Sequence, residues 1–172
     1  MDDNNLSLKQ IVKLPSVIMR NASYYESYTD QLQDDICSQY SVPEMTLIIN
    51  SLFKKFRNCK YVCRFSIEDT ISITPSYEEK IGFIPKKISN KTEDAILGYL
   101  NNKHFVARFY DSLVDLSKKI TKREAVYLVG AFFNGKSEEK IAEMIGISKT
   151  SLQPIKKSCL VKMIIQFKIM GD

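Results

Sequence analysis

The sequence contains one histidine and only four cysteines, and this scarcity bears on metal binding. Cys59 and Cys63 stand four positions apart, a spacing unlike the usual CxxC zinc motif, and no second ligand pair follows them. We therefore predict no metal site and no cofactor, and interpret the cysteines as reduced thiols of an intracellular protein. The remaining candidates for such a site are His104, Cys37 and Cys159.

Long apolar runs are also missing. Stretches such as residues 163–165 fall far short of the roughly 20 residues that span a membrane. Residues 1–5 are acidic and polar and do not resemble a signal peptide. We therefore expect no membrane partner and a cytoplasmic location.

Motifs of the common enzyme classes are absent as well. The sequence has no glycine-rich phosphate loop, no cluster of metal ligands and no Ser/His/Asp arrangement at an informative spacing. The acidic pairs at 34–35 and 68–69 are neighbours in sequence and do not by themselves resemble a nuclease or glycosidase site. We predict that the protein is not an enzyme.

The charge balance is mildly basic, with 25 lysines and arginines against 20 aspartates and glutamates and a formal net charge of +5. This excess permits a polyanionic partner without requiring one. The hydrophobic content of 44% is enough for one core or for two small helical units. The pattern of these residues predicts a mainly α protein.

The first region, residues 1–74, is predicted to be mostly helical. One or two helices are expected between Leu6 and Tyr40, with a helix start near Pro15 because proline fits a first turn. Pro43 is expected to open a helix over residues 44–57, whose cationic end suits the helix dipole or, as an alternative, contacts DNA phosphate. Residues 61–74 alternate apolar and polar and predict a small β-hairpin. The apolar face of the 44–57 helix is predicted to consist of Met45, Ile48, Ile49, Leu52, Phe53 and Phe56.

Residues 75–91 contain two prolines and a glycine among charged residues and predict a loop or linker. Thr92 is expected to cap a long helix that runs to about Lys118. Residues 92–172 then form the second region, a long helix followed by a compact helical unit.

Local signals for helix ends accumulate between residues 120 and 148. Thr121 and Glu124 have the spacing of a capping box, and Gly135 is placed to end the helix that follows. Ser137 is expected to cap a short helix whose first turn holds Glu138 and Glu139.

The short helix is followed by a glycine and then by a third helix. Gly146 can adopt the left-handed conformation of a tight turn, and Ile147 is expected to fill the gap between the helices. Ala142 provides the small residue needed where the helices cross, and Ser148 can cap the third helix. This order of helix, tight turn and helix predicts a helix-turn-helix.

The third helix has the charge pattern of a DNA-recognition helix. Residues 149–168 include five lysines and no acidic residue. An amphipathic helix with a solvated basic face is the alternative interpretation. Pro154 lies inside this segment, so the helix is expected either to start later or to bend. The candidate phosphate contacts are Lys149, Lys156 and Lys157, the candidate base contacts are Thr150, Ser151 and Gln153, and Ser137 completes the predicted DNA-binding set.

Residues 136–148 and 120–124 resemble the C-terminal domain of bacterial sigma factors, the part that reads the −35 promoter element. This similarity extends over roughly the last 50 residues. It implies a sigma-region-4-like helix-turn-helix that binds double-stranded DNA.

A second resemblance covers more of the chain. Residues 73–77 (Ile-Thr-Pro-Ser-Tyr), a glycine-containing loop, residues 91–93 (Lys-Thr-Glu), a long helix and the helix-turn-helix are similar to the ArpU/RinA-type regulators of phage late genes. The resemblance implies a transcription activator of late genes in phages or prophages, acting in the cytoplasm of a bacterial host.

Two other functions stay open at this point. A sigma-like factor would bind RNA polymerase, but residues 6–74 contain no counterpart of the basic, aromatic region that melts the −10 element. A protein-interaction module would keep the helix-turn-helix without binding DNA. RNA polymerase and a second copy of this chain are therefore further candidate partners.

Overall fold

The computed structural model describes residues 6–24, 31–60 and 85–171. These residues are mainly helical, as predicted, and no β-strand occurs among them. The predicted hairpin at 61–74 and most of the predicted linker lie outside the described residues. The helices are α1 (Leu8–Asn21), α2 (Gln31–Gln39), α3 (Val42–Cys59), α5 (Pro85–Ser117), α6 (Lys122–Leu128), α7 (Glu138–Ile145) and α8 (Lys149–Gly171), with a π-helical turn, η3 (Val129–Phe133), after α6.

Helix α1 begins earlier than the sequence suggested. Ser7 is its N-cap and forms a capping box with Gln10, so Pro15 lies inside the helix and the predicted start near Pro15 is wrong. Proline has no N–H to donate to the carbonyl four residues earlier. The helix continues through it because an apolar face on both sides of the proline is buried, formed by Ile11, Leu14 and Ile18.

Helix α3 agrees closely with the prediction. Ser41 caps it in a capping box with Glu44, and Pro43 lies in the first turn. The predicted apolar face packs inward at Met45, Ile49, Phe53 and Phe56, whereas Ile48 keeps 39% of its surface exposed.

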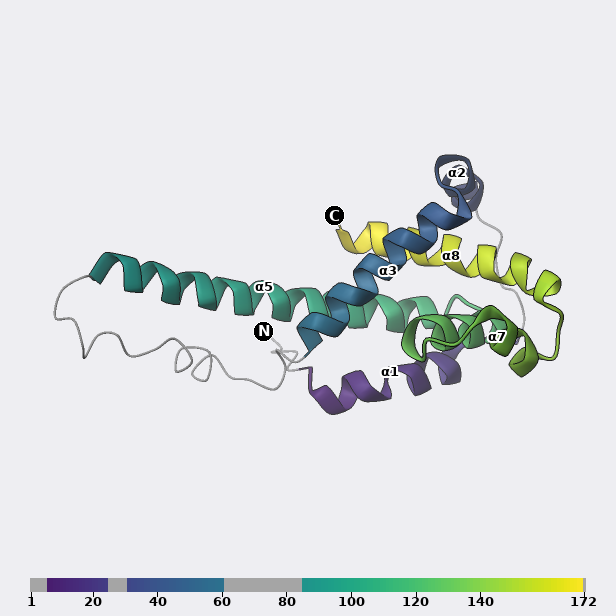
Figure 1. Cartoon of the computed structure of the whole chain (residues 1–172), viewed down its shortest axis with the longest axis horizontal. Coiled ribbons are helices and arrows are strands. Elements are labelled where there is room, and N and C mark those ends of the chain that lie inside the picture. The colour runs from purple at the N-terminus through teal and green to yellow at the C-terminus, as the bar shows by residue number, and fades with distance from the viewer. Residues whose placement is uncertain (1–5, 25–30, 61–84, 172) are drawn as a thin grey trace.

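Helix α5 starts at Pro85, so residues 85–91 of the predicted linker are helical and Thr92 lies within the helix instead of capping it. Proline suits the first helical position, and no glycine or proline between Pro85 and Thr92 interrupts the helix. The N-terminal part of α5 extends beyond the other helices (Figure 1).

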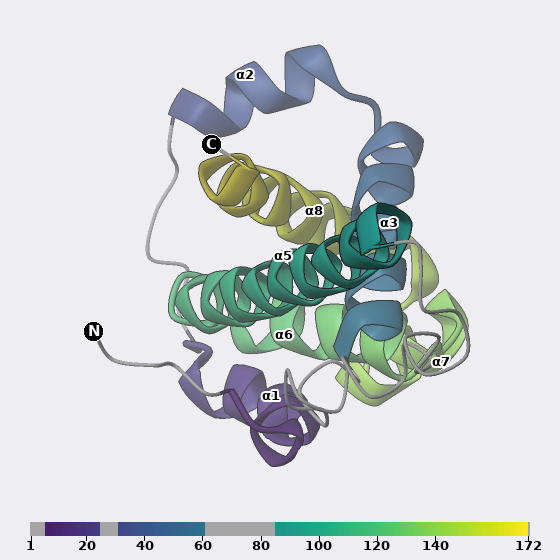
Figure 2. The same ribbon diagram turned by 90° about the vertical axis from the view of Figure 1, so that its left-hand side faces the viewer.

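One hydrophobic core joins the helices of both predicted regions. Its buried side chains come from α1, α2, α3, α5, α6, α7 and α8. Helix α8 lies between α2 and α5 (Figure 2), and the rings of Phe109 and Phe167 stack with their centroids 5.1 Å apart. The division into 1–74, 75–91 and 92–172 was predicted from the sequence. The described buried residues of the first and third of these ranges belong to one core.

The π-helical turn η3 positions two adjacent phenylalanines against one partner. The Asn134 N–H donates to the carbonyl oxygen of Val129, five residues earlier, at 3.0 Å. Phe132 and Phe133 both contact Phe53 of α3, with centroid distances of 5.0 and 5.2 Å. The turn therefore helps to attach the C-terminal helices to α3.

Candidate nucleic-acid interface

Helices α6, α7 and α8 follow one another in the order predicted for a helix-turn-helix. Helix α6 continues through η3, and the chain then passes Gly135, whose φ is +61°. Ser137 caps α7 and accepts a hydrogen bond from the Lys140 N–H at 3.4 Å. The predicted cap of the short helix is confirmed.

The turn between α7 and α8 has the hydrogen bonds of a Schellman motif. Gly146 has φ +81° and ψ +34°, and its N–H donates to the carbonyl oxygen of Glu143 at 3.1 Å. The Ile147 N–H donates to the carbonyl oxygen of Ala142 at 3.0 Å. Ala142 is buried and Ile147 is half-buried against the core. The predicted left-handed turn at Gly146 is confirmed, and the burial of Ala142 and Ile147 agrees with their predicted packing.

Helix α7 also packs closely against η3, at a residue that the sequence pattern did not single out. A Cβ atom added to Gly130 would lie 3.0 Å from Cγ1 of Ile141 and 3.3 Å from its Cδ1. Gly130 therefore lets η3 approach α7 closely. A glycine within an apolar stretch was the available signal.

Helix α8 begins at Lys149, so a later start at Pro154 is excluded. The Ser148 hydroxyl accepts a hydrogen bond from the Ser151 N–H at 3.1 Å, as expected of an N-cap. Pro154 cannot donate to the Thr150 carbonyl, but both residues are exposed, so water can reach that oxygen.

The structure brings most of the predicted DNA-binding residues to the exposed side of the first turns of α8. The opposite side is buried, through Leu152, Cys159, Leu160 and Met163. Lys156 differs from the others because it is half-buried. The exposed members of the predicted set are Ser137, Lys149, Thr150, Ser151, Gln153 and Lys157.

Two glutamates of α7 contact this surface. Glu139 pairs with Lys149 at 2.8 Å, and Glu138 pairs with Lys156 at 2.5 Å. Nε2 of Gln153 also donates to Glu138, at 3.2 Å. The sequence pattern predicts both glutamates in the first turn of α7 but does not indicate these partners in α8.

These ion pairs shift the titration of the groups involved. The hydrogen bond from Lys156 lowers the pKa of Glu138, against the opposing effect of burial, and Gln153 lowers it further. The hydrogen bond between Lys149 and Glu139 lowers the pKa of the glutamate and raises that of the lysine. Both carboxylates are therefore charged at neutral pH and offset part of the positive charge of α8.

Glu124 does not complete the predicted capping box. The Thr121 hydroxyl accepts from the Glu124 N–H at 3.2 Å, but the carboxylate turns inward and is 3% exposed. It accepts two hydrogen bonds from Nζ of Lys162, both at 3.0 Å, and one from Ser158 at 3.2 Å. The side chain therefore fixes α6 against α8, which meets its need for a buried partner better than an exposed cap would.

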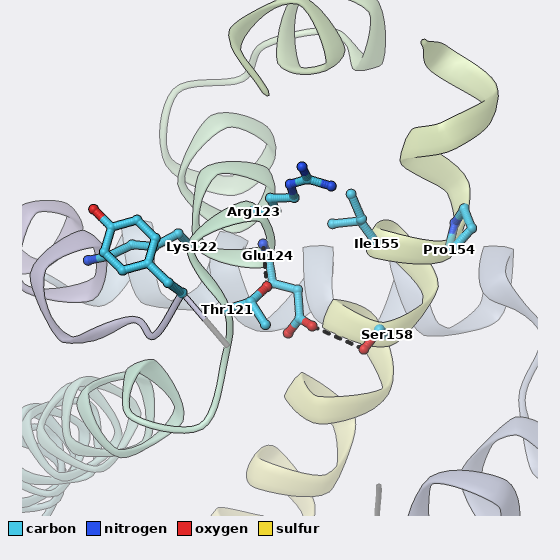
Figure 3. Close-up of a pocket in the computed structure, with 8 residues that line it drawn as sticks. Thr121, Lys122, Arg123, Glu124, Pro154, Ile155 and Ser158 are labelled. Carbon is cyan, nitrogen blue, oxygen red and sulfur yellow. Dashed lines mark hydrogen bonds between the residues drawn. The ribbon is translucent and has the colours of Figure 1, made fainter. Parts of the chain in front are cut away.

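A pocket of about 520 Å³ opens between the start of α6 and α8. Figure 3 shows Glu124 pointing toward Ser158 on one side of it, with Arg123 near Ile155. Lys122 donates to the last carbonyls of α1, at Met19 and Arg20. Lys122 is thus engaged in attaching α1. The pocket is lined by Tyr24, Thr121, Lys122, Arg123, Glu124, Pro154, Ile155 and Ser158.

Within the described ranges, no three histidine, cysteine, aspartate or glutamate side chains gather as a group able to hold a metal. None of the described helices is long and apolar enough to cross a membrane. Comparison with family models, with curated proteins and with solved structures gives no match for this chain. Its function is therefore inferred from the geometry of α6, α7 and α8.

Proposed function

We propose that this protein binds double-stranded DNA as a transcription regulator, with α8 lying in the major groove. The observation that carries the proposal is the α7–α8 unit: a capped short helix, a left-handed glycine turn, and a following helix whose exposed side carries lysines, hydroxyls and an amide. The resemblance to late-gene regulators extends the proposal to activation of phage or prophage late genes.

The exposed side chains divide by chemistry. Lys149 and Lys157 provide point charges suited to phosphates. Thr150, Ser151 and Gln153 reach toward base edges. The Ser137 hydroxyl accepts from the Lys140 N–H and also hydrogen-bonds to the Glu139 side chain, so Ser137 acts first on the start of α7.

Lys156 has a different role from the one the sequence suggested. Its side chain is only 16% exposed and pairs with Glu138. It therefore acts first on the contact between α7 and α8, and contributes less to phosphate binding than Lys157.

A salt titration tests the proposal. The purified protein is titrated with the DNA upstream of its own gene at several salt concentrations, alongside a Lys149→Ala/Lys157→Ala variant. Each phosphate contact contributes about 0.9 to the slope of log K against log salt, so the double variant is expected to lose about two units of slope. It leaves the Lys156–Glu138 pair in place.

The matched control removes two lysines from another exposed helix. Lys9 and Lys13 lie on the exposed side of α1, which packs on α5, α6 and η3. Lys9→Ala/Lys13→Ala changes the net charge equally and is expected to keep the slope. Equal binding by both double variants would contradict DNA contact through α8.

The second candidate function is a protein-interaction module. It is favoured by the glutamates of α7, which neutralise Lys149 and Lys156. Absence of salt-dependent DNA binding, together with copurification of core RNA polymerase, would support it. Copurification together with DNA binding would instead support the sigma-like alternative.

A further inference from the structure

The side-chain amide of Gln153 has a defined orientation. Its contact atom lies 3.2 Å from Oε2 of Glu138. An ionised carboxylate only accepts hydrogen bonds, so the atom facing it is the Nε2 donor. The same Nε2 also lies 3.4 Å from the carbonyl oxygen of Lys149, one turn earlier in α8. Both N–H groups of the amide are thus directed at acceptors within the protein.

Glu138 is itself held in place by a second contact. Its other oxygen, Oε1, pairs with Nζ of Lys156 at 2.5 Å. The Glu138 and Lys156 side chains are 30% and 16% exposed, so this pair is partly shielded from water. Lys156 therefore fixes Glu138, and Glu138 fixes the amide of Gln153.

This arrangement leaves Gln153 with one group for an external partner, the Oε1 acceptor. A glutamine whose amide is unconstrained reads adenine with two hydrogen bonds, donating to N7 and accepting from the N6 amino group. A glutamine whose donors are already engaged can only accept. In the major groove, adenine and cytosine present an amino donor, whereas guanine and thymine present acceptors at these positions.

We infer that Glu138 is a positioning residue that makes Gln153 a reader of exocyclic amino groups, so that adenine or cytosine is selected over guanine or thymine at one position of the site. This inference rests on the proposed DNA binding. It replaces the bidentate adenine contact that a free glutamine would make.

The test uses Glu138→Gln, which preserves the shape of the side chain. Lys156 requires an acceptor, so the amide oxygen at position 138 is expected to stay with Lys156 and its NH₂ group to face Gln153. Gln153 is then expected to turn its own oxygen inward and its NH₂ outward, giving up its long contact with the Lys149 carbonyl. The preference at that position is expected to change from adenine or cytosine to guanine or thymine.

The measurement is a binding selection from duplexes randomised over the site, performed with the full chain. One hydrogen bond to a base is expected to give about a five- to tenfold preference in the wild type. Gln153→Ala is expected to reduce that preference to near one. The wild-type selection also separates adenine from cytosine, which carry the same amino chemistry.

Glu139→Gln is the matched control. It removes the same charge from the neighbouring residue, whose partner is Lys149 and not Gln153. Binding is expected to strengthen for all sequences alike, because an anion near the phosphates is lost and Lys149 is released. The preference at the Gln153 position is expected to remain.

The outcomes separate this inference from the proposed function. Absence of salt-dependent DNA binding by the wild type would overturn both the proposed function and this inference. Binding with an unchanged preference in Glu138→Gln, or a wild-type preference for guanine or thymine, would overturn the role of Glu138 and leave DNA binding intact.

A measurement on the wild type covers a failure of Glu138→Gln to fold. The Gln153 side-chain amide resonances are expected to follow the titration of the Glu138 carboxylate, with the same midpoint. Gln153 amide resonances that do not change over the pH range in which Glu138 titrates would overturn the inference.

Discussion

Gly146 holds the turn between α7 and α8 in a left-handed conformation, with φ +81°. A Cβ atom added there would meet no other atom within 4 Å. Any cost of a side chain at this position therefore comes from the backbone and not from crowding.

We expect Gly146→Val to lower the free energy of unfolding by about 1–2 kcal/mol or more, because a β-branched residue reaches this region with strain. Gly146→Asn is the control, since asparagine tolerates the left-handed region, and it is expected to cost less. Chemical denaturation of both variants measures the difference. If both unfold at the parent midpoint, the turn relaxes freely and its conformation matters little.

Glu124 and Lys162 form a buried ion pair between α6 and α8. Its side chains are 4% and 9% exposed, so each charge depends on the other for its solvation. Ser158 provides a further hydrogen bond to the carboxylate.

Lys162→Met is expected to destabilise the fold by about 3–5 kcal/mol, because it leaves Glu124 buried without its cation. The double variant Glu124→Leu/Lys162→Met removes both charges and is expected to recover most of that loss. Thermal and denaturant unfolding of the two variants provide the comparison. A double variant as unstable as the single one would show that packing, and not charge, dominates this contact.

The hydrogen bonds of Glu138 connect helix α7 to helix α8. Lys156 lowers the pKa of this carboxylate from its ordinary value of 4.5. A group whose pKa is lowered on folding stabilises the folded state above the unfolded value and loses that effect as pH falls through the folded value. The contact between α7 and α8 is therefore complete near neutral pH and weakens only below about 4.5.

The Glu138 carboxyl resonance is expected to titrate with a midpoint below 4.5, and Lys156→Met is expected to raise that midpoint. Lys157→Met is the control, because Lys157 is the exposed neighbour and does not bind Glu138 in the structure. NMR of the side-chain carboxyl carbons measures all three proteins. An equal shift in both variants would mean that general charge, and not the hydrogen bond, lowers the pKa.

Helix α8 belongs both to the candidate DNA-binding surface and to the core of the whole molecule. Its first turns carry the candidate DNA-binding side chains, and its later turns pack on α2, α3 and α5. The Phe109–Phe167 stack and the hydrogen bond from Lys119 to Gln166 at 3.1 Å connect α8 to α5 and the segment that follows it. The candidate interface therefore lies on a helix whose other turns are part of the main core.

Phe109→Ala is expected to reduce the free energy of unfolding by about 3–5 kcal/mol, because Phe109 is fully buried and its ring contacts four other phenylalanines. Resonances of α1 and of α7 are expected to be lost in one transition. Leu97→Ala on the same helix is the control, since Leu97 is 56% exposed, and is expected to change stability by less than about 0.5 kcal/mol. Separate melting of α1 and α7 would indicate two independent units.

Features that depend on residues close together in the chain were predictable from the amino-acid sequence alone. The Ser137 cap and the Gly146 turn were predictable because capping and turn hydrogen bonds join residues three to five positions apart. The mainly helical class followed from the same short-range periodicity. These features also set where α7 and α8 begin, and so which helix carries the candidate DNA-binding residues.

Which side chains meet across the fold was visible in the structure but not in the sequence pattern. Glu124 matched a capping box locally, but its partner Lys162 lies 38 residues away. Glu138 likewise finds Lys156 18 residues away, and this contact gives Gln153 its orientation. Burial and charge pairing across helices outweigh the weak local preferences of an exposed cap, and one sequence does not state which helix faces will meet.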